Sequence, residues 1–572
     1  MKSKLNKTVT IYTLLMLIVF PLFMVHTYYD IQTVKMYFYQ LSTLACAGVS
    51  LLIALIYIIK DRSARKAFTE GIKPKNLKKL LRPVDVFALI FLAAVLVSTF
   101  ASEWVYEAFW GNMARFMGGY MLSLFVISYF LITRYYVPKR LHIDILLLAG
   151  VILCGWAVLD YFSLSPIGFG YDTLFSSTIG NIDVLTSIEV MYVGIAAVMY
   201  ISEKTEDKAS RSRSLYYLVV SLICFMGLEC GRTANLLLSF PFLICFIPFY
   251  AFGTAKGTLR YIDLLMVYMV GLLIIAGLVA KFPDYACSQD LMGELDGFAN
   301  NHPKLVFEAL IGLALVRLAA GLALKKYTGG LNLAAASGAA SLSGTDKPSE
   351  EPKTKKNDDR TGKLKQANVI TTETLNQPGT AASERRLARC LRIIWGVLGI
   401  AAFCVLIYIF YDANTGGHPE RYAAVSNLVI FNKSWGTDRG YVWSLGMKYF
   451  NEFPLIKKLI GSGPETFAIY VVKYDLNQTL SIFDVSYDSV HNEWLQHLFE
   501  CGVIGCIGFY GMAAGACVKG LKNGACTAAL SFAVMAYFVQ SFVNISVPIV
   551  LPFVIICLAV AAGYNTFEYS SK

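Results

Sequence analysis

The chain has 572 residues, of which 56% are hydrophobic and 16% are charged, and its formal net charge is +11. Soluble domains carry about 25% charged residues, so this composition excludes a set of soluble domains. It indicates a polytopic membrane protein.

Long apolar runs predict the membrane spans. A bilayer core about 30 Å thick requires roughly 20 apolar residues per helix, and we interpret uncharged runs near that length as spans. About fourteen such runs occur, which predicts an all-α polytopic membrane protein with 12–15 transmembrane helices. The predicted spans are 11–27, 38–59, 85–101, 117–133, 142–159, 184–200, 215–230, 235–252, 262–280, 305–323, 393–411, 501–518, 525–543 and 547–563.

Lysine and arginine in short loops predict the orientation, because such loops stay in the cytoplasm. The N-terminus and the 60–82 loop are strongly basic. Counting spans from there places every other strongly basic loop, and both termini, on the cytoplasmic side of an inner membrane. The net positive charge therefore reflects cytoplasmic loops that face anionic lipids, and it implies no nucleic-acid partner.

Changes in composition divide the chain into five regions. The 412–500 region is polar and lies between apolar spans, so we expect the chemistry there, because lipid-facing helices need little beyond hydrophobicity. The regions are 1–327, a transmembrane part of about ten spans; 328–390, a disordered cytoplasmic linker; 391–411, one span; 412–500, an extracytoplasmic catalytic segment; and 501–572, the C-terminal spans.

His491 is the candidate general base of the 412–500 region. A helix is predicted to start near Val490, with Ser489 as its N-cap. The partial positive charge of a helix N-terminus disfavours an imidazolium, so this ring is expected to be neutral near pH 7 and able to deprotonate a hydroxyl nucleophile. The alternative is an interfacial residue that anchors the helix and pairs with Asp484 or Asp488.

Three arginines fall in predicted outer loops, where positive residues are disfavoured. They are Arg115, Arg232 and Arg439, and Arg232 occupies a very short turn. A guanidinium fork binds a pyrophosphate bidentately, whereas lysine acts as a point charge. With His491 they predict a site for an anionic headgroup; the alternative for each arginine alone is a charge at a helix end.

Polar turns supply further candidates for substrate binding. The turns at 180–183 and 461–465 contain glycines, and their backbone N–H groups can approach phosphate, although such glycines often only reverse the chain. The candidates are Asn181, Gly463, Glu465 and Asn492. Outer aromatic residues, which stack on sugars or form an interfacial belt, are Tyr422, Trp435, Tyr441, Trp443 and Trp494.

Motifs for a bound metal or nucleotide are missing from the sequence. There is no phosphate-binding Walker loop, zinc-protease helix or paired outer carboxylate motif. His497 lies about 240° round a helix from His491, which does not favour a metal pair. The thirteen cysteines show no spacing typical of disulfides or metal sites. We therefore expect no metal and no cofactor.

An ordered set of motifs lies in the 431–510 segment. It begins with Asp438-Arg439-Gly440 with Trp443, Phe453-Pro454-Leu455, and Gly461-Ser462-Gly463-Pro464-Glu465. It continues in His491-Asn492-Glu493-Trp494-Leu495-Gln496 and Glu500-Cys501-Gly502. With these motifs the segment resembles the O-antigen ligase family of polytopic glycan ligases and polymerases, and weaker matches to that family surround Arg115, Asn181 and Arg232.

This resemblance implies a function. The expected reaction is inverting transfer of a glycan from a polyprenyl (undecaprenyl) pyrophosphate carrier to an acceptor hydroxyl, outside the cytoplasmic membrane and without metal or nucleotide sugar. Arg232 and Arg439 are then expected to hold the pyrophosphate, His491 to take the acceptor's proton, and Arg115 to fix the carrier headgroup.

Two other functions remain open from the sequence. A polysaccharide transporter or lipid-linked oligosaccharide flippase has similar hydropathy, but it concentrates ionisable residues near the membrane midplane, where this chain has only Glu189, Glu308 and Arg317. A non-catalytic scaffold for envelope assembly predicts that His491 and the arginines lie apart.

Overall fold

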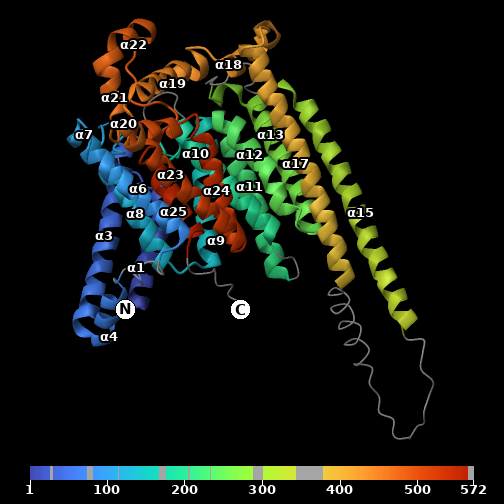
Figure 1. The fold of residues 1–572 in the computed structure, drawn as a ribbon. Helices are drawn as coiled ribbons and strands as arrows, with labels where there is room; N and C mark the ends of the chain where they lie inside the picture. The colour runs from blue at the N-terminus through green and yellow to red at the C-terminus, as the bar shows by residue number, and fades with distance from the viewer. Residues whose placement is uncertain are drawn as a thin grey trace. The chain divides into compact units, whose positions relative to one another are not determined.

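The computed structural model describes most of the chain, namely residues 1–25, 30–71, 73, 76, 81–113, 115–166, 176–203, 207–231, 233–287, 301–342 and 378–563. Every regular element in these ranges is a helix (Figure 1). The prediction of an all-α polytopic membrane protein is therefore confirmed.

The helices follow the predicted apolar runs. The first part of the chain contains α1 (Lys2–Leu14), α2 (Phe20–Leu22), α3 (Ile31–Lys60), α4 (Arg62–Gly71), α6 (Pro83–Phe100), α7 (Val105–Trp110), α8 (Gly119–Tyr135), α9 (Arg140–Tyr161), α10 (Ile182–Ser202), α11 (Lys208–Gly231), α12 (Ala234–Ala251) and α13 (Ala255–Lys281). The second part contains α15 (Pro303–Leu342), α17 (Pro378–Asn414), α18 (Ser426–Val429), α19 (Trp435–Glu452), α20 (Leu455–Ile460), α21 (Phe467–Tyr470), α22 (Leu476–Phe483), α23 (Glu493–Lys522), α24 (Ala525–Gln540) and α25 (Leu551–Ala561).

Ten helices in the described part of the chain are long and apolar enough to cross a membrane. The other predicted spans correspond to shorter apolar helices at Gly119–Tyr135, Leu236–Ala251, Ala525–Gln540 and Leu551–Ala561. The number of fourteen spans therefore stays a prediction.

The boundaries of the predicted 328–390 linker fall within helices. α15 continues to Leu342 and α17 begins at Pro378, while residues 343–377 lie outside the described residues. The 331–342 stretch is rich in alanine and leucine, and these residues have high helix propensity, so the end of α15 continues beyond the apolar span.

The described residues form two compact units. The large unit comprises Met1–Ile244, Gly271–Pro303 and Leu406–Lys572, and the small unit comprises Cys245–Val270 and Lys304–Val405. The central helix of the large unit is α10, whose apolar window is completely buried. A helix that is apolar all round is stable only when other helices surround it.

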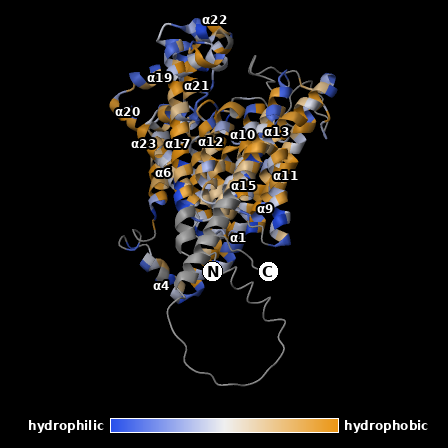
Figure 2. Ribbon diagram, turned by 90° about the vertical axis from the view of Figure 1, so that its right-hand side faces the viewer, coloured by the Kyte–Doolittle hydropathy of each residue, from blue (hydrophilic) through white to orange (hydrophobic). Residues whose placement is uncertain are grey.

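The two ends of the large unit differ. In Figures 1 and 2, the α19–α22 region lies at one end, and the N-terminus and the basic helix α4 lie at the opposite end. Between these ends the helices are mainly hydrophobic (Figure 2). This arrangement agrees with the predicted separation of the basic loops from the 412–500 region, and which end faces the cytoplasm stays a prediction.

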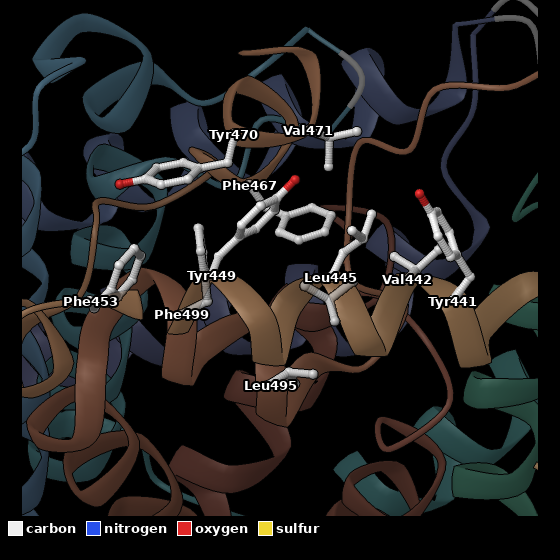
Figure 3. Packing of buried hydrophobic residues seen from close by; sticks show 11 residues of the cluster. Tyr441, Val442, Leu445, Tyr449, Phe453, Phe467, Tyr470, Val471, Leu495 and Phe499 are labelled. Atoms are coloured by element: carbon white, nitrogen blue, oxygen red, sulfur yellow. The ribbon is translucent and has the colours of Figure 1, made fainter. Parts of the chain in front are cut away.

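An aromatic cluster fixes the 435–500 segment onto α23 (Figure 3). α19 ends at Glu452, two residues before Pro454, which cannot continue a helix. Burying each such side chain contributes about 1.5–3 kcal/mol, so the cluster is a major support for this segment. Its members are Tyr441, Val442, Leu445, Tyr449, Phe453, Phe467, Tyr470, Val471, Val490, Leu495 and Phe499.

The 461–465 turn packs backbone to backbone against α23. Gly461 has φ +85°, and a Cβ atom there would overlap the carbonyl of Glu500. α23 is distorted at Gly502, which has φ +67°, and a Cβ atom at Gly502 would lie 2.6 Å from the Gly461 nitrogen. Both positions therefore require glycine, and their contact sets the position of the turn.

We predict that Gly461→Ala destabilises the protein by more than about 2 kcal/mol, because the residue combines a strained backbone conformation with a backbone overlap. Thermal unfolding of the purified protein in detergent measures this effect. Gly48→Ala is the control, because no atom lies within 4 Å of its added Cβ. Equal unfolding temperatures for the two variants would contradict the packing described.

Candidate functional site

Most of the predicted site residues lie at the α19–α22 end of the large unit. Arg115 follows α7, Arg439 lies on α19, Glu465 lies in the turn after α20, and His491 precedes α23. Arg232 lies outside the described residues. Its neighbour Thr233 pairs its hydroxyl with that of Thr186 on α10 at 2.7 Å.

Arg115 and Glu465 form a buried ion pair. Arg115 Nε lies 3.6 Å from Glu465 Oε1, and the two side chains are 3% and 1% exposed. Arg115 Nη2 also donates to the Ser546 carbonyl at 3.4 Å. Arg115 Nε and Nη1 lack hydrogen-bond partners among the described residues. Burial raises the pKa of Glu465, and Arg115 opposes that increase.

Glu500 of α23 holds the turn that presents Glu465. Glu465 N–H donates to Glu500 Oε1 at 2.8 Å, and Gly463 N–H donates to the Glu500 carbonyl at 3.0 Å. Gln496 donates to the same Glu500 side chain. The backbone donors of Gly463 and Glu465 are thus occupied, contrary to the expectation that they face a phosphate, and the turn instead positions the Glu465 carboxylate.

Arg439 follows three residues, Gly436 to Asp438, that have positive φ angles. Its Nη1 donates to the Gly436 carbonyl at 2.6 Å, and its Nη2 lies 4.0 Å from Asp183 Oδ2 at the start of α10. Nε has no hydrogen-bond partner among the described residues. Burial lowers the pKa of Arg439, and Asp183 opposes this shift. The Arg439 side chain is thus 16% exposed, and its charge is only partly neutralised.

His491 lies in the loop before α23 and has φ +53°. Its Nδ1 lies 3.2 Å from both the carbonyl and the hydroxyl of Ser489. An Nδ1–H that donates to the carbonyl leaves the lone pair on Nε2. Burial lowers the pKa of His491, as do the positive charges of Arg439 and Arg115. The ring is therefore neutral near pH 7 and has a proton-accepting nitrogen.

The predicted helix start at Ser489 and Val490 is wrong. α23 begins at Glu493, and Asn492 is its N-cap, whose side chain accepts from Leu495 N–H at 3.0 Å. The left-handed backbone of His491 cannot continue a helix, so the N-cap of α23 is the next residue, Asn492. Within the described chain, the ring bonds to Ser489 rather than to Asp484 or Asp488.

The loop between α24 and α25 connects the two arginine sites. Asn544 Nδ2 donates to the Asp183 carbonyl at 3.4 Å, and the Ser546 carbonyl accepts from Arg115. On the opposite side, Val490 N–H donates at 2.8 Å to Gln496, which in turn binds Glu500. Hydrogen bonds and ion pairs therefore connect the surroundings of Arg439, Arg115 and His491.

Asn181 and Asn492 both serve as helix caps. Asn181 Oδ1 accepts from Val184 N–H at 3.1 Å at the start of α10. Asn181 thus fixes the start of α10, which carries Asp183, and Asn492 fixes the start of α23, which follows His491. Substrate contacts by either residue stay a prediction.

An apolar cavity of about 700 Å³ adjoins the histidine loop. Its lining includes Asn492, and the indole of Trp443, another lining residue, donates to the His491 carbonyl at 3.4 Å. Of the predicted aromatic residues, Trp443 and Trp494 line this cavity, whereas Tyr441 is buried in the aromatic cluster. The lining suits an apolar chain better than a sugar ring.

The groups that hold the basic residues in place were not predicted from the sequence. Asp183 was seen only as part of a turn, and Glu500 and Gln496 only as part of a motif. Gln496 and Glu500 are four residues apart, which places both side chains on one face of α23, and this spacing could have indicated that they interact. Nothing in the sequence marked the carbonyl of Ser546.

The ionisable residues predicted inside the spans have different surroundings. Glu308 is exposed and lies 3.9 Å from Lys304, and Arg317 pairs with Asp263 at 2.6 Å. Glu189 is completely buried, without a hydrogen-bond partner for its carboxyl oxygens among the described residues. Within the described part, no group of three or more His, Cys, Asp or Glu residues has an arrangement for a metal ion.

Residues 381–510 match the family model described as O-Antigen ligase. The match contains the 431–510 segment that carries the resemblance and supports an O-antigen ligase family assignment, which confirms the predicted family. It also supports a role as a membrane glycan ligase or polymerase. No curated protein matches the chain.

We predict that Glu465→Leu destabilises the protein by about 3–5 kcal/mol, because it leaves the Arg115 charge buried without its nearest counterion. Arg115→Met combined with Glu465→Leu should recover most of that stability, since an apolar pair replaces the ion pair. Thermal unfolding of the three proteins provides the measurement. A double variant less stable than Glu465→Leu would show that Glu465 does not stabilise the protein through its ion pair with Arg115.

Proposed function

Since the chain carries the O-antigen ligase match, we propose that it is an inverting glycosyltransferase that moves a glycan from a polyprenyl pyrophosphate carrier to an acceptor hydroxyl. The observation that carries this proposal is the grouping of a buried guanidinium (Arg115), a partly buried guanidinium (Arg439) and a neutral imidazole at one end of the large unit. Arg439 and Arg115 both lower the pKa of His491, so each guanidinium lies within electrostatic range of the imidazole ring.

The arginines bind the pyrophosphate. Each has one carboxylate at 3.6–4.0 Å and at least one N–H donor without a partner among the described residues. A buried, partly neutralised guanidinium attracts a polyanion strongly because water does not screen it. Arg439 and Arg115 thus stabilise the negative charge that develops on the leaving group, and we assign Arg232 the same role.

His491 is the general base. The acceptor oxygen attacks the anomeric carbon while its proton passes to Nε2 of His491. The bond between that carbon and the pyrophosphate oxygen breaks, and its electron pair leaves with the pyrophosphate. A single displacement of this kind inverts the anomeric centre, and the energy comes from the pyrophosphate-linked donor.

The apolar cavity beside His491 accommodates part of the carrier's hydrocarbon chain. Its lining by Phe431, Trp443 and Trp494 provides apolar contacts next to the reacting groups. We place the site on the outer face of the cytoplasmic membrane, where ATP is absent. The reaction then needs only the lipid-linked donor and an acceptor glycan, lipid or protein, without a metal.

His491→Ala should abolish glycan transfer while the protein remains abundant in the membrane. The assay uses purified protein with a polyprenyl pyrophosphate-linked glycan and candidate acceptors in the presence of EDTA. His497→Ala is the matched control; this ring is buried, stacks on Phe509 and bonds to the Glu493 carbonyl, so a smaller loss of transfer is expected. Full activity of His491→Ala, or wild-type activity that requires magnesium, would contradict the proposal.

The pH dependence of transfer should reflect the lowered pKa of His491. A general base is active when unprotonated, so activity should persist as the pH falls through 6.5, the ordinary histidine value, and decline only below it. Asp488 raises this pKa, so Asp488→Asn should shift the acid limb to lower pH. Rates measured from pH 5 to 8 for the wild type and for Asp488→Asn give the acid limb of each protein. An acid limb above pH 6.5 in the wild type would argue against His491 as the base.

A further inference from the structure

The small unit contains a second cavity with a basic lining. It has a volume of about 480 Å³ and is lined by Phe249, Arg385, Arg389, Arg392 and Ile393. None of these residues takes part in the site described above. The cavity is therefore a separate feature that glycan transfer does not explain.

The three arginines lie on one side of α17. Their spacing of four and then three residues places them on neighbouring turns of the same helix face. The guanidinium of Arg392 lies against the turn after α12, where a Cβ atom on Gly253 would come within 2.8 Å of Nη2. Phe249 of α12 provides the apolar wall. The cavity thus lies between two helices of the same unit.

Aromatic contacts hold these two helices together. The indole of Trp395, on the next turn of α17, donates to the Cys245 carbonyl of α12 at 2.7 Å. The same ring packs edge-on against Phe252 at 5.9 Å and Tyr261 at 6.1 Å. The arginines therefore lie on a helix that is packed against α12, and not on a free chain end.

Among the described residues, none of those that line this cavity is acidic. Asp263 of the small unit already pairs with Arg317 at 2.6 Å. Neither Arg389 nor Arg392 forms an ion pair with any described residue. The positive charges of Arg389 and Arg392 lie on adjacent turns and repel one another, so an anion bound between them relieves that repulsion.

The surroundings of the cavity indicate an amphipathic ligand. Directly after the arginines, α17 becomes an exposed apolar helix, with Ile393, Ile394 and Val397 each about 60% exposed. In a membrane protein, such a surface contacts lipid tails, which places the arginines at the level of the headgroups. We propose that this cavity binds the phosphodiester headgroup of an anionic phospholipid, with its acyl chains along the apolar face of α17.

The test compares lipids with identical acyl chains. Native mass spectrometry of the full-length protein gives the affinities for phosphatidylglycerol and phosphatidylcholine. The wild type should prefer phosphatidylglycerol. Arg392→Gln should weaken that binding about fivefold, and Arg389→Gln with Arg392→Gln about 25-fold, if each arginine contributes about 1 kcal/mol. Arg386→Gln removes the same charge from outside the cavity lining and should leave the affinity within about twofold.

Three outcomes would overturn the proposal. Equal binding of the two lipids by the wild type, which requires no variant to fold, would exclude headgroup recognition. An equal loss of affinity in Arg386→Gln and Arg392→Gln would mean that the lipid responds to the total positive charge of this helix and not to the cavity. Displacement of phosphatidylglycerol by millimolar inorganic phosphate would identify a site for soluble phosphate. Because the test measures lipid affinity, its result is independent of glycan transfer.

Discussion

The candidate site depends on the burial of positive charge that its protein neighbours neutralise only in part. A buried guanidinium is costly unless it is paired and hydrogen-bonded. Arg115 and Arg439 each have one carboxylate, at 3.6 Å and 4.0 Å, and each retains N–H groups without partners among the described residues. An anionic ligand with several oxygen atoms completes both environments, which is why we interpret the site as one for pyrophosphate.

Backbone strain and close packing maintain this arrangement. Residues with left-handed backbone conformations lie at or beside each basic group: Phe116 after Arg115, Asp438 before Arg439, Glu465 opposite Arg115, and His491 itself. Such conformations cost about 1–3 kcal/mol each and persist only where the surroundings enforce them. The aromatic cluster between α19, α21 and α23 and the contact of Gly461 with Gly502 provide those surroundings.

Hydropathy predicted the fold well because apolar runs and helices coincide in membrane proteins. The basic residues of the candidate site could also be proposed from the sequence, since Arg115 and Arg439 fall in predicted outer loops, where positive residues are disfavoured, and His491 lies in a polar region beside a predicted span. Their anchoring groups were not, because Asp183, Glu500 and the Ser546 carbonyl reach the site through contacts between segments distant in sequence. The cap prediction failed for a local reason: the backbone at His491 is left-handed, which the sequence does not reveal. Arg232 lies outside the described residues, so its part in the site remains a prediction.

We assign binding of the carrier headgroup to the arginines and proton transfer to His491, and equilibrium binding separates these roles. The most direct measurement is the affinity of the purified wild type, Arg439→Gln and His491→Ala for a polyprenyl pyrophosphate without glycan. We expect His491→Ala to bind as tightly as the wild type and Arg439→Gln to bind at least about tenfold more weakly, because a charge-assisted hydrogen bond of about 1.5–3 kcal/mol is lost. Equal affinity of all three proteins, or a loss confined to His491→Ala, would contradict this assignment.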